Sequence, residues 1–176
     1  MNSVLGLTHK TVLLVPYDAQ WPALFEREAN LIREHVKPDI REIVHIGSTA
    51  IPGLDAKPII DLMAGIADLR APWSLFVRLA DLGYEHRPLD TVSDRHFFAK
   101  DTHGLRTHNL SVCVWGSPFW ASHLKFRDRL RSDELVAKAY AKLKRELANR
   151  FPDDRVAYTN AKDHFIVNAL SHKNEA

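Results

Sequence analysis

The apolar residues of the N-terminal third predict a short strand followed by a helix. The run Thr11–Val15 is predicted as a strand, because five apolar or β-branched residues follow one another there. From Trp21 onward the apolar positions recur three or four residues apart, which is the spacing of an amphipathic helix. Asp18 is expected to cap this helix, and Pro38 marks its end.

The middle of the chain is richer in strand-like runs. A helix is expected over Leu69–Leu82, with Gly83 as its C-terminal stop. The loop Asp101–Arg106 contains Gly104 and is expected to close a hairpin. Short apolar or alternating segments predict about five strands, over Ile43–Ile46, Ile59–Ile66, Tyr84–Arg87, His96–Lys100 and His108–Trp115.

The C-terminal third returns to helical spacing. Ser117–Pro118 combines a capping residue with proline at the first helical position. Ser132 is expected to cap the next helix, and helices are predicted over Pro118–Arg131, Asp133–Asn149 and Val156–Ser171. The pattern therefore predicts a single α/β (α+β) domain over residues 1–176. It holds a mixed sheet of about five strands flanked by helices, with a C-terminal helical part.

Composition narrows the class of protein without naming an activity. With 176 residues the chain can bury one substantial core, and no apolar run approaches the ~20 residues of a membrane span. The N-terminus lacks the features of a signal peptide, and the single cysteine, Cys113, suits a reducing cytoplasm. The net charge of +2 and the mixed charges of Lys125–Arg150 make nucleic acid an unlikely partner. Oligomeric state stays open.

The segment His45–Met63, HIGSTAIPGLDAKPIIDLM, holds the clearest candidate chemistry. An apolar run ends at Gly47–Ser48–Thr49, a small hydroxyl-bearing loop of the kind whose free N–H groups can hold phosphate. Lys57 opens a second apolar run, and it either neutralises phosphate charge or is a solvated lysine before the strand. This run contains one acid, Asp61, and a carboxylate inside a strand is costly unless it is paired or holds a cation. An ordinary turn and a buried acid satisfied by backbone donors or an arginine remain the alternative.

Other polar residues are candidates with a structural alternative beside each. His45 is either a satisfied, half-buried side chain or a phosphate contact and general base. Arg95 and Lys100 are exposed edge charges or groups that close over an anionic substrate. His108 lies on the same face of the sheet as Asp61 or on the opposite face, depending on strand register.

Further charged residues are expected to have structural roles. Asp90 and Asp94 are most simply loop residues rather than metal ligands. For the basic residues Arg127 and Lys162 we expect ion pairs with the acids that follow them, Asp128 and Asp163.

Five segments resemble the GrpB family, small bacterial proteins placed in the nucleotidyltransferase superfamily with DNA polymerase beta. They are VPYDAQWPALFEREA (Val15–Ala29), HIGSTAIPGLDAKPIIDLM (His45–Met63), RHFFAK (Arg95–Lys100), WGSPFWASHLKFRDRLR (Trp115–Arg131) and YTNAKDHFI (Tyr158–Ile166). They keep their order along nearly the whole chain. The resemblance implies a mixed α/β fold with a nucleotidyltransferase-type sheet.

The resemblance also implies roles for residues in the candidate loop. In the superfamily a Gly-Ser pair holds a nucleoside triphosphate, and an acid-x-acid pair on the next strand holds Mg²⁺. Gly47 and Ser48 match the pair, Asp61 matches the first acid, and Met63 occupies the second acid position. A thioether is a poor ligand for Mg²⁺. The family strand Thr-His-His-Leu-His reads Thr-His-Asn-Leu-Ser over Thr107–Ser111.

Three functions from different classes follow. The first is a Mg²⁺-dependent nucleotidyltransferase that binds a nucleoside triphosphate through Gly47–Ser48–Thr49, with Asp61 as the metal-binding or acceptor-activating acid. The second is a non-catalytic accessory module that binds a nucleotide or another phosphorylated small molecule. The third is a phosphoesterase that uses His45 or His108. The first is preferred slightly over the second, and both over the third.

Overall fold

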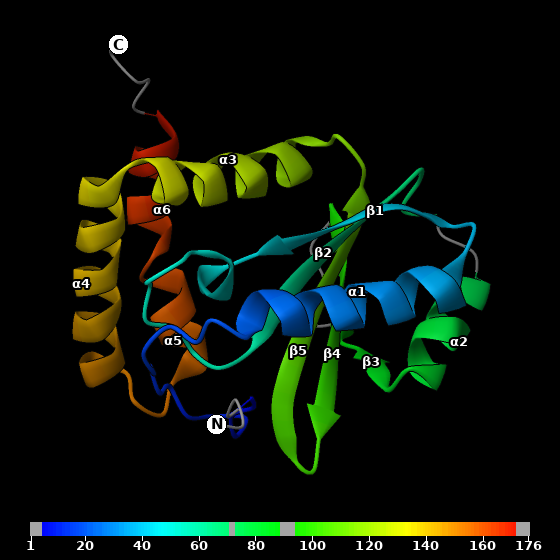
Figure 1. The fold of residues 1–176 in the computed structure, drawn as a ribbon, viewed down its shortest axis with the longest axis horizontal. Helices are drawn as coiled ribbons and strands as arrows, with labels where there is room; N and C mark the ends of the chain where they lie inside the picture. Colours follow the sequence, from blue (N-terminus) through cyan, green and yellow to red (C-terminus); the bar gives the residue numbers. More distant parts are fainter. Residues whose placement is uncertain (1–4, 71–72, 89–93, 172–176) are drawn as a thin grey trace.

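The centre of the protein is a five-stranded mixed sheet. The computed structural model describes residues 5–70, 73–88 and 94–171. The strand order is β1-β2-β5-β4-β3, in which β2 and β5 run parallel and the other neighbours are antiparallel (Figure 1). The strands are β1 (Ile40–Ile46), β2 (Ile60–Ile66), β3 (Tyr84–His86), β4 (Arg95–Thr102) and β5 (Leu105–Val114). The mixed α+β sheet expected from the apolar pattern is confirmed.

Two helices cover one face of this sheet. They are α1 (Trp21–Val36) and α2 (Trp73–Asp81). The apolar stripe of α1 faces inward, and its buried apolar residues are Trp21, Phe25, Ala29, Ile32 and Val36. These side chains join the same core cluster as Leu62 of β2 and Leu110 of β5. The helical spacing that predicted α1 is therefore the spacing that builds the main core.

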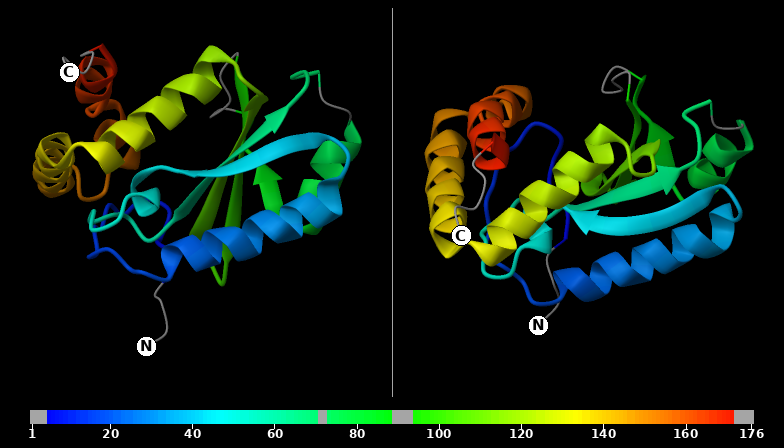
Figure 2. Two further views of the ribbon diagram at one scale, coloured as in Figure 1. Left: turned by 45° about the horizontal axis from the view of Figure 1, so that its top comes forward. Right: turned by 90° about the horizontal axis from the view of Figure 1, so that it is seen from above.

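The remaining helices lie along the other face and beyond one edge. A 3-10 turn, η1 (Ser48–Ala50), follows β1. α3 (Pro118–Ser132) packs Trp120 against Met63 and Cys113 on this face. α4 (Glu134–Arg150), α5 (Arg155–Asn160) and α6 (Asp163–Ser171) form a group apart from α1 and α2 (Figure 2).

Helix caps decide where these elements begin. The Ser117 hydroxyl accepts the backbone N–H of Trp120, as predicted. The predicted Ser132 cap is wrong: Ser132 is still helical, and its hydroxyl donates to the Arg129 carbonyl. Asp133 caps α4 instead, through its carboxylate. Asp18 is not the N-cap of α1 either: the helix starts at Trp21, Gln20 is its N-cap, and the Asp18 carboxylate accepts the N–H of Gln20.

Two predicted elements have different forms in the structure. The segment Thr11–Val15 is not a strand: Val15 makes one isolated bridge with Ala56, and the Val12 N–H donates to the Pro152 carbonyl. The segment therefore connects the loop before β2, through Val15, with the turn after α4, through Val12. The predicted helix Val156–Ser171 is divided into α5 and α6, because a tight turn after Asn160 interrupts it.

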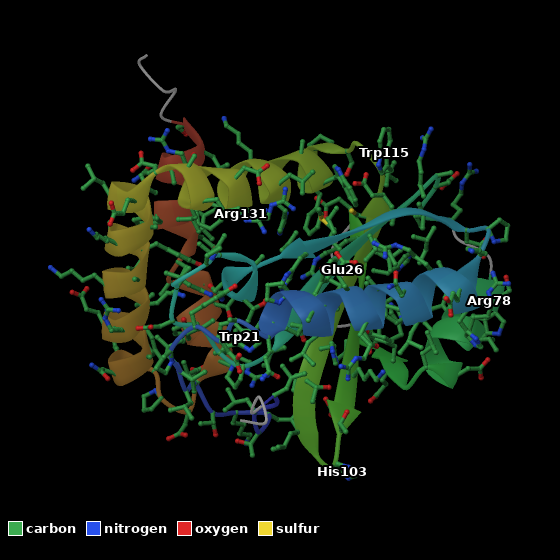
Figure 3. All side chains as sticks on the ribbon, in the orientation of Figure 1. Trp21, Glu26, Arg78, His103, Trp115 and Arg131 are labelled. Carbon is green, nitrogen blue, oxygen red and sulfur yellow. The ribbon has the colours of Figure 1, made fainter. Side chains whose placement is uncertain are left out.

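The remaining predictions differ mainly in length. α2 begins at Trp73, four residues later than expected, and residues 71–72 lie outside the described part. The expected hairpin joins β4 and β5 through a two-residue turn, with His103 at its tip (Figure 3). Cys113 is buried in the core, and burial raises the pKa of its thiol to about 11. No described helix is long and apolar enough to cross a membrane.

Candidate functional site

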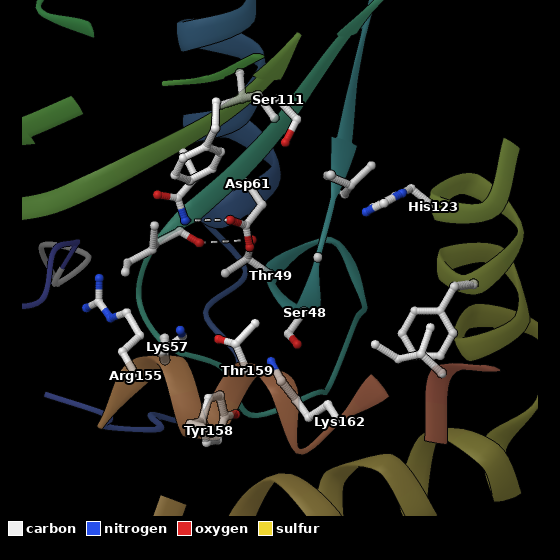
Figure 4. A pocket seen from close by; sticks show the side chains of 18 of the residues that line it. Ser48, Thr49, Lys57, Asp61, Ser111, His123, Arg155, Tyr158, Thr159 and Lys162 are labelled. Carbon is white, nitrogen blue, oxygen red and sulfur yellow. Dashed lines mark hydrogen bonds between the residues drawn. The ribbon is translucent and has the colours of Figure 1, made fainter. Parts of the chain in front are cut away.

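A cavity of about 650 Å³ lies where the sheet meets the C-terminal helices. Its walls come from distant parts of the chain: the loop after β1, the strands β2, β4 and β5, and the helices α3 to α6. Figure 4 shows side chains from the strands and from α5 extending toward one another across it. A cavity of this size is in the usual range for a small-molecule site.

Strand pairing positions the one carboxylate of this cavity. In the parallel register Asp61 of β2 lies opposite Asn109 of β5, so both side chains leave the sheet on the same face. The Asn109 amide N–H donates to Asp61 Oδ1 at 2.8 Å. Burial raises the pKa of Asp61, while the Asn109 hydrogen bond and the charge of Lys57 oppose the shift.

The loop after β1 passes directly over Asp61. Gly47 has a φ of +72°, and a Cβ built there would meet Asp61 Oδ2 and approach the Asp61 Cβ to 3.0 Å. Only glycine accommodates both the positive φ and this close approach. The next residues form η1, in which Ser48 faces the cavity and the Thr49 hydroxyl donates to the Ile59 carbonyl at 3.5 Å (Figure 4). The conformation of Gly47 and the Thr49 side chain therefore keep the loop beside Asp61.

Cationic side chains surround this loop and acid. Lys57 and Lys162 lie on the ring of Tyr158, with their ammonium nitrogens 5.2 and 4.4 Å from the ring centre. Arg155 of α5 and Arg106 of β5 also line the cavity. Burial, with the positive charges of Lys162 and Arg155, lowers the pKa of Lys57 to about 7, and burial lowers the pKa of Lys162 to about 8. Arg106 is paired with Asp101 at 2.6 Å, while the other three cations share a cavity in which Asp61 is the only acid among the described lining residues.

The described residues do not fit a Mg²⁺ ion. No three of their His, Cys, Asp or Glu side chains form a group that could hold a metal. Asp61 is the only acid among the described residues that line the cavity. Met63, in the position of the second acid, is fully buried against the core, and Asn109 directs an N–H at Asp61. Mg²⁺ takes oxygen ligands in octahedral geometry, and Asp61 alone leaves most of those positions to water or to the phosphates of a ligand, so the described residues do not form a Mg²⁺ site by themselves.

Several residues predicted from sequence do come together. Gly47, Ser48, Thr49 and Lys57 line the cavity beside Asp61. Arg95 also lines it, and its guanidinium donates to the Ser111 hydroxyl at 3.2 Å. The loop after β1, the start of β2 and the start of β4 therefore contribute candidate residues to one cavity.

Three other candidates lie on the opposite face of the sheet. His45 is stacked on Phe25 at 4.6 Å and shares a 3.0 Å hydrogen bond with Thr49. Burial, with the nearby arginines, lowers the pKa of His45 to about 3, so the ring is neutral. Lys100 and His108 are paired across β4 and β5 and approach Glu28 of α1, at 2.8 and 4.0 Å.

These three positions follow from register. His45 pairs with Leu62, and His108 pairs with Ile60, both of which alternate with Asp61 along β2. Lys100 and His108 therefore lie against Glu28 of α1, and His45 lies against Phe25 of the same helix, rather than in the cavity. Burial lowers the pKa of His108 to about 4.

The remaining charged candidates divide between structural and cavity positions. Arg127 makes the expected ion pair with Asp128 at 2.7 Å, and it also donates to the His45 carbonyl at 3.2 Å and lines the cavity. Lys162 lies over Tyr158 in the cavity, a position that the expected pairing with the following acid did not anticipate. Asp94 is exposed, and Asp90 lies outside the described residues.

Sequence reasoning missed the residues that the C-terminal helices contribute. Arg155, Lys162 and His123 enter the cavity from α5, the turn after it and α3. Asn109 and Ser111 also line the cavity. From the sequence they are noted only as residues that replace two histidines of the family strand. The conspicuous run Tyr158–Ile166 was the available signal, because it places Tyr, Asn and Lys on one short segment.

Comparisons with known proteins agree on one family. The model of the GrpB protein family matches residues 11–172. The glutamate-rich protein GrpB of Alkalihalophilus pseudofirmus is 36% identical over 172 residues, covering 96% of this chain and 99% of the relative. A UPF0157 protein of Pseudomonas aeruginosa is 39% identical over 161 residues, covering 89% of this chain and 65% of the relative.

A solved structure extends this agreement to the fold. The crystal structure of the conserved protein GrpB from Enterococcus faecalis matches with a TM-score of 0.81 at 30% identity. The match covers 90% of this chain and 94% of that one. The family expected from the five sequence segments is thus supported by a family model, by relatives in sequence and by a three-dimensional match, and this chain belongs to the GrpB family.

Proposed function

We propose that this protein binds a nucleoside triphosphate or a related phosphoester, with the phosphates against Gly47–Ser48–Thr49. One observation carries the proposal: buried lysines and arginines converge on this loop, and Asp61 is the only acid among the described cavity residues. Lys57, Arg155 and Lys162 surround the loop from two sides. Such an excess of positive charge in a cavity favours a multiply charged anion.

The electrostatics of the lysines explain why a polyphosphate is favoured over a single carboxylate. Burial holds the pKa of both Lys57 and Lys162 far below the usual lysine value, and repulsion from Lys162 lowers the pKa of Lys57 further. An anion with several charges would restore both ammonium groups to full charge and relieve that repulsion. Charge-assisted hydrogen bonds from such groups are stronger than those between neutral partners.

This binding needs no metal ion. Asp61 is the only carboxylate among the described residues that line the cavity, so the surrounding lysines and arginines would neutralise the phosphates. A nucleotide could carry its own Mg²⁺ into the cavity, held mainly by its phosphates and by water.

Nucleotidyl transfer is the second candidate, and the environment of Asp61 favours it. A buried carboxylate with a raised pKa is a better proton acceptor than an exposed one. An acceptor hydroxyl would lose its proton to Asp61 while its oxygen forms a bond to the α-phosphorus. The bond to the pyrophosphate oxygen would break, and the pyrophosphate would leave toward Lys57 and Lys162. A non-catalytic accessory module would bind the same ligand without releasing pyrophosphate.

Calorimetry with ATP, GTP, CTP, UTP and tripolyphosphate, each in EDTA and then in Mg²⁺, tests binding. We expect binding in EDTA, and a loss of about tenfold or more in Lys162→Ala, since that change removes a buried charge-assisted contact. Lys138→Ala is the matched control, because Lys138 lies on the exposed face of α4. No binding of any of the five compounds would contradict the proposal.

Labelled nucleotides separate the two candidates. Pyrophosphate release that is lost in Asp61→Ala, with affinity retained, supports transfer. Binding without release under all acceptors tried, and with Asp61→Ala unchanged in affinity, supports the accessory module.

A further inference from the structure

The imidazole of His123 is held in one orientation and one tautomer by the backbone of its own helix. Its Nδ1 lies 2.8 Å from the Phe119 carbonyl oxygen. A carbonyl can only accept, so Nδ1 carries the proton and donates it. Burial lowers the pKa of His123 and Arg95 lowers it further, against the opposing effect of this hydrogen bond. The ring is therefore neutral near pH 7, and its other nitrogen, Nε2, is an acceptor.

That acceptor faces the cavity. Figure 4 shows the His123 ring extending from α3 toward the side where Asp61 lies. Its only hydrogen bond among the described residues is the one from Nδ1. An unprotonated ring nitrogen in a partly buried cavity gains most from a ligand that donates an N–H or O–H to it.

Flat side chains lie beside the His123 ring and line the same cavity. The Phe119 ring lies 4.1 Å from the His123 ring, centre to centre. The Arg95 guanidinium lies over Phe97 at 4.7 Å and over Phe119 at 5.6 Å, and it donates to Ser111. We call Phe97, Phe119 and His123 the aromatic wall. It belongs to β4 and α3, whereas Lys57, Arg155 and Lys162 approach from the loop before β2 and from the α5 region.

We propose that the aromatic wall takes the base of the bound nucleotide, and that His123 Nε2 accepts a hydrogen bond from an N–H group of that base. The inference rests on the proposed function, because it assigns the second part of the same ligand. To the proposed function it adds one ligand-binding residue, His123, which accepts a hydrogen bond from the ligand. It also adds the chemical class of that part of the ligand, a planar nitrogen heterocycle that bears a hydrogen-bond donor.

The unprotonated Nε2 of His123 disfavours a phosphate oxygen as its partner. A phosphate oxygen is an acceptor, and two acceptors cannot share a hydrogen bond. Aromatic and guanidinium faces stack on a heterocycle, with base–aromatic stacking contributing about 1–3 kcal/mol per base. The phosphates and the base are therefore directed to different walls of one cavity.

Calorimetry with two probes, ATP and tripolyphosphate, tests this assignment. Both compounds carry the phosphates, and only ATP carries the base. We expect wild type to bind ATP more tightly than tripolyphosphate. His123→Phe keeps a flat ring and removes the acceptor, so it should weaken ATP binding about fivefold to tenfold and leave tripolyphosphate unchanged.

A second variant and a control distinguish a loss of binding from a loss of folding. Phe119→Leu removes a stacking face and should weaken ATP selectively as well. His35→Ala, on the exposed part of α1, should change neither affinity. Each variant is compared with wild type by its thermal midpoint, so that a loss of fold is recognised.

Each outcome decides one claim. Equal losses for both probes in His123→Phe and Phe119→Leu would overturn the base subsite, as would ATP binding no more tightly than tripolyphosphate in wild type. With 2′,3′-dideoxy-ATP the effect of His123→Phe should be as large as with ATP. An effect that vanishes there would place a ribose hydroxyl, not the base, on Nε2. If neither probe binds wild type, the proposed function fails and the subsite falls with it.

Discussion

The side-chain amide of Asn109 donates to Oδ1 of Asp61 at 2.8 Å, across the one parallel pair of strands in the sheet. This contact satisfies a carboxylate that burial would otherwise leave costly. It also places a hydrogen-bond donor where a metal site would need a second oxygen ligand. The cavity is therefore organised around a neutral–anionic pair rather than around a cluster of acids.

Asn109→Asp should create metal affinity that wild type lacks. The new carboxylate would lie beside Asp61 on the same face, and two close carboxylates repel each other unless a cation lies between them. Titration with Mn²⁺ should show binding in Asn109→Asp and none in wild type. Asn30→Asp, on the exposed face of α1, is the control. Equal Mn²⁺ binding in wild type and Asn109→Asp would show that the metal does not depend on this pair.

Gly47→Ala should destabilise the protein more than Gly53→Ala does. Both glycines have positive φ, +72° and +76°, and at Gly47 the ψ of −173° completes a backbone conformation that essentially only glycine adopts, at a cost of about 1–3 kcal/mol for another residue. At Gly53 nothing lies within 4 Å of an added Cβ, whereas at Gly47 that Cβ would meet Asp61. The contact should add about 1–3 kcal/mol to the loss in unfolding free energy. Urea denaturation measures both losses.

The double variant Gly47→Ala/Asp61→Ala identifies the cause. If the close approach to Asp61 is responsible, removing the carboxylate should return most of the excess loss. An excess that persists would assign it to the backbone of the loop instead.

The sequence predicts a secondary-structure element correctly where the pattern that defines the element lies within the element itself. The stripe of α1 and the Ser117–Pro118 start of α3 are local patterns, and both are confirmed. Ser132 and Asp133 are both good capping residues for α4. Asp133 is the N-cap because α3 extends through Ser132. The break after Asn160 has no proline or glycine to announce it.

The candidate site divides along the same line. Gly47 and Asp61 are 14 positions apart on one β-turn-β segment, so their proximity could be read from the sequence. Lys162 and His123 reach the cavity through the packing of helices, which no local pattern encodes. The sequence could not exclude Lys100 and His108 from the site, because the alternation of side chains along a strand fixes which residues share a face but not which face meets the cavity.

Asp61→Asn should stabilise the protein at pH 7 and have less effect near pH 4. Burial raises the pKa of Asp61 in the folded state above its unfolded value. The folded protein therefore binds more protons than the unfolded chain between these two values, so stability falls as pH rises through that window. The variant lacks this ionisation, and an amide at position 61 can still accept from Asn109.

Thermal unfolding of wild type and variant between pH 4 and pH 8 measures the difference. The midpoint of Asp61→Asn should rise above that of wild type as pH increases. Asp153→Asn, an exposed change in the turn after α4, should show no such trend. A variant that is less stable at pH 7 than at pH 4, relative to wild type, would mean that the ionised carboxylate stabilises the fold.

Binding of tripolyphosphate should take up protons near pH 7.5. The pKa of Lys57 is lowered to about 7 and that of Lys162 to about 8, so both are partly neutral at this pH. The anion favours the charged ammonium and raises both pKa values, and protons enter with the ligand. Affinity should therefore be higher at pH 6 than at pH 9, since both lysines are charged at the lower pH.

Calorimetry in two buffers of different ionisation enthalpy, PIPES and Tris, measures this uptake as a difference in apparent binding enthalpy. The double variant Lys57→Arg/Lys162→Arg is the matched control, because arginine keeps its charge at every pH used. Its remaining buffer dependence reports protonation of tripolyphosphate itself, and the excess in wild type belongs to the lysines. Equal uptake in wild type and the arginine variant would mean that the anion does not lie against Lys57 and Lys162, and the phosphate end of the cavity would have to be sought elsewhere.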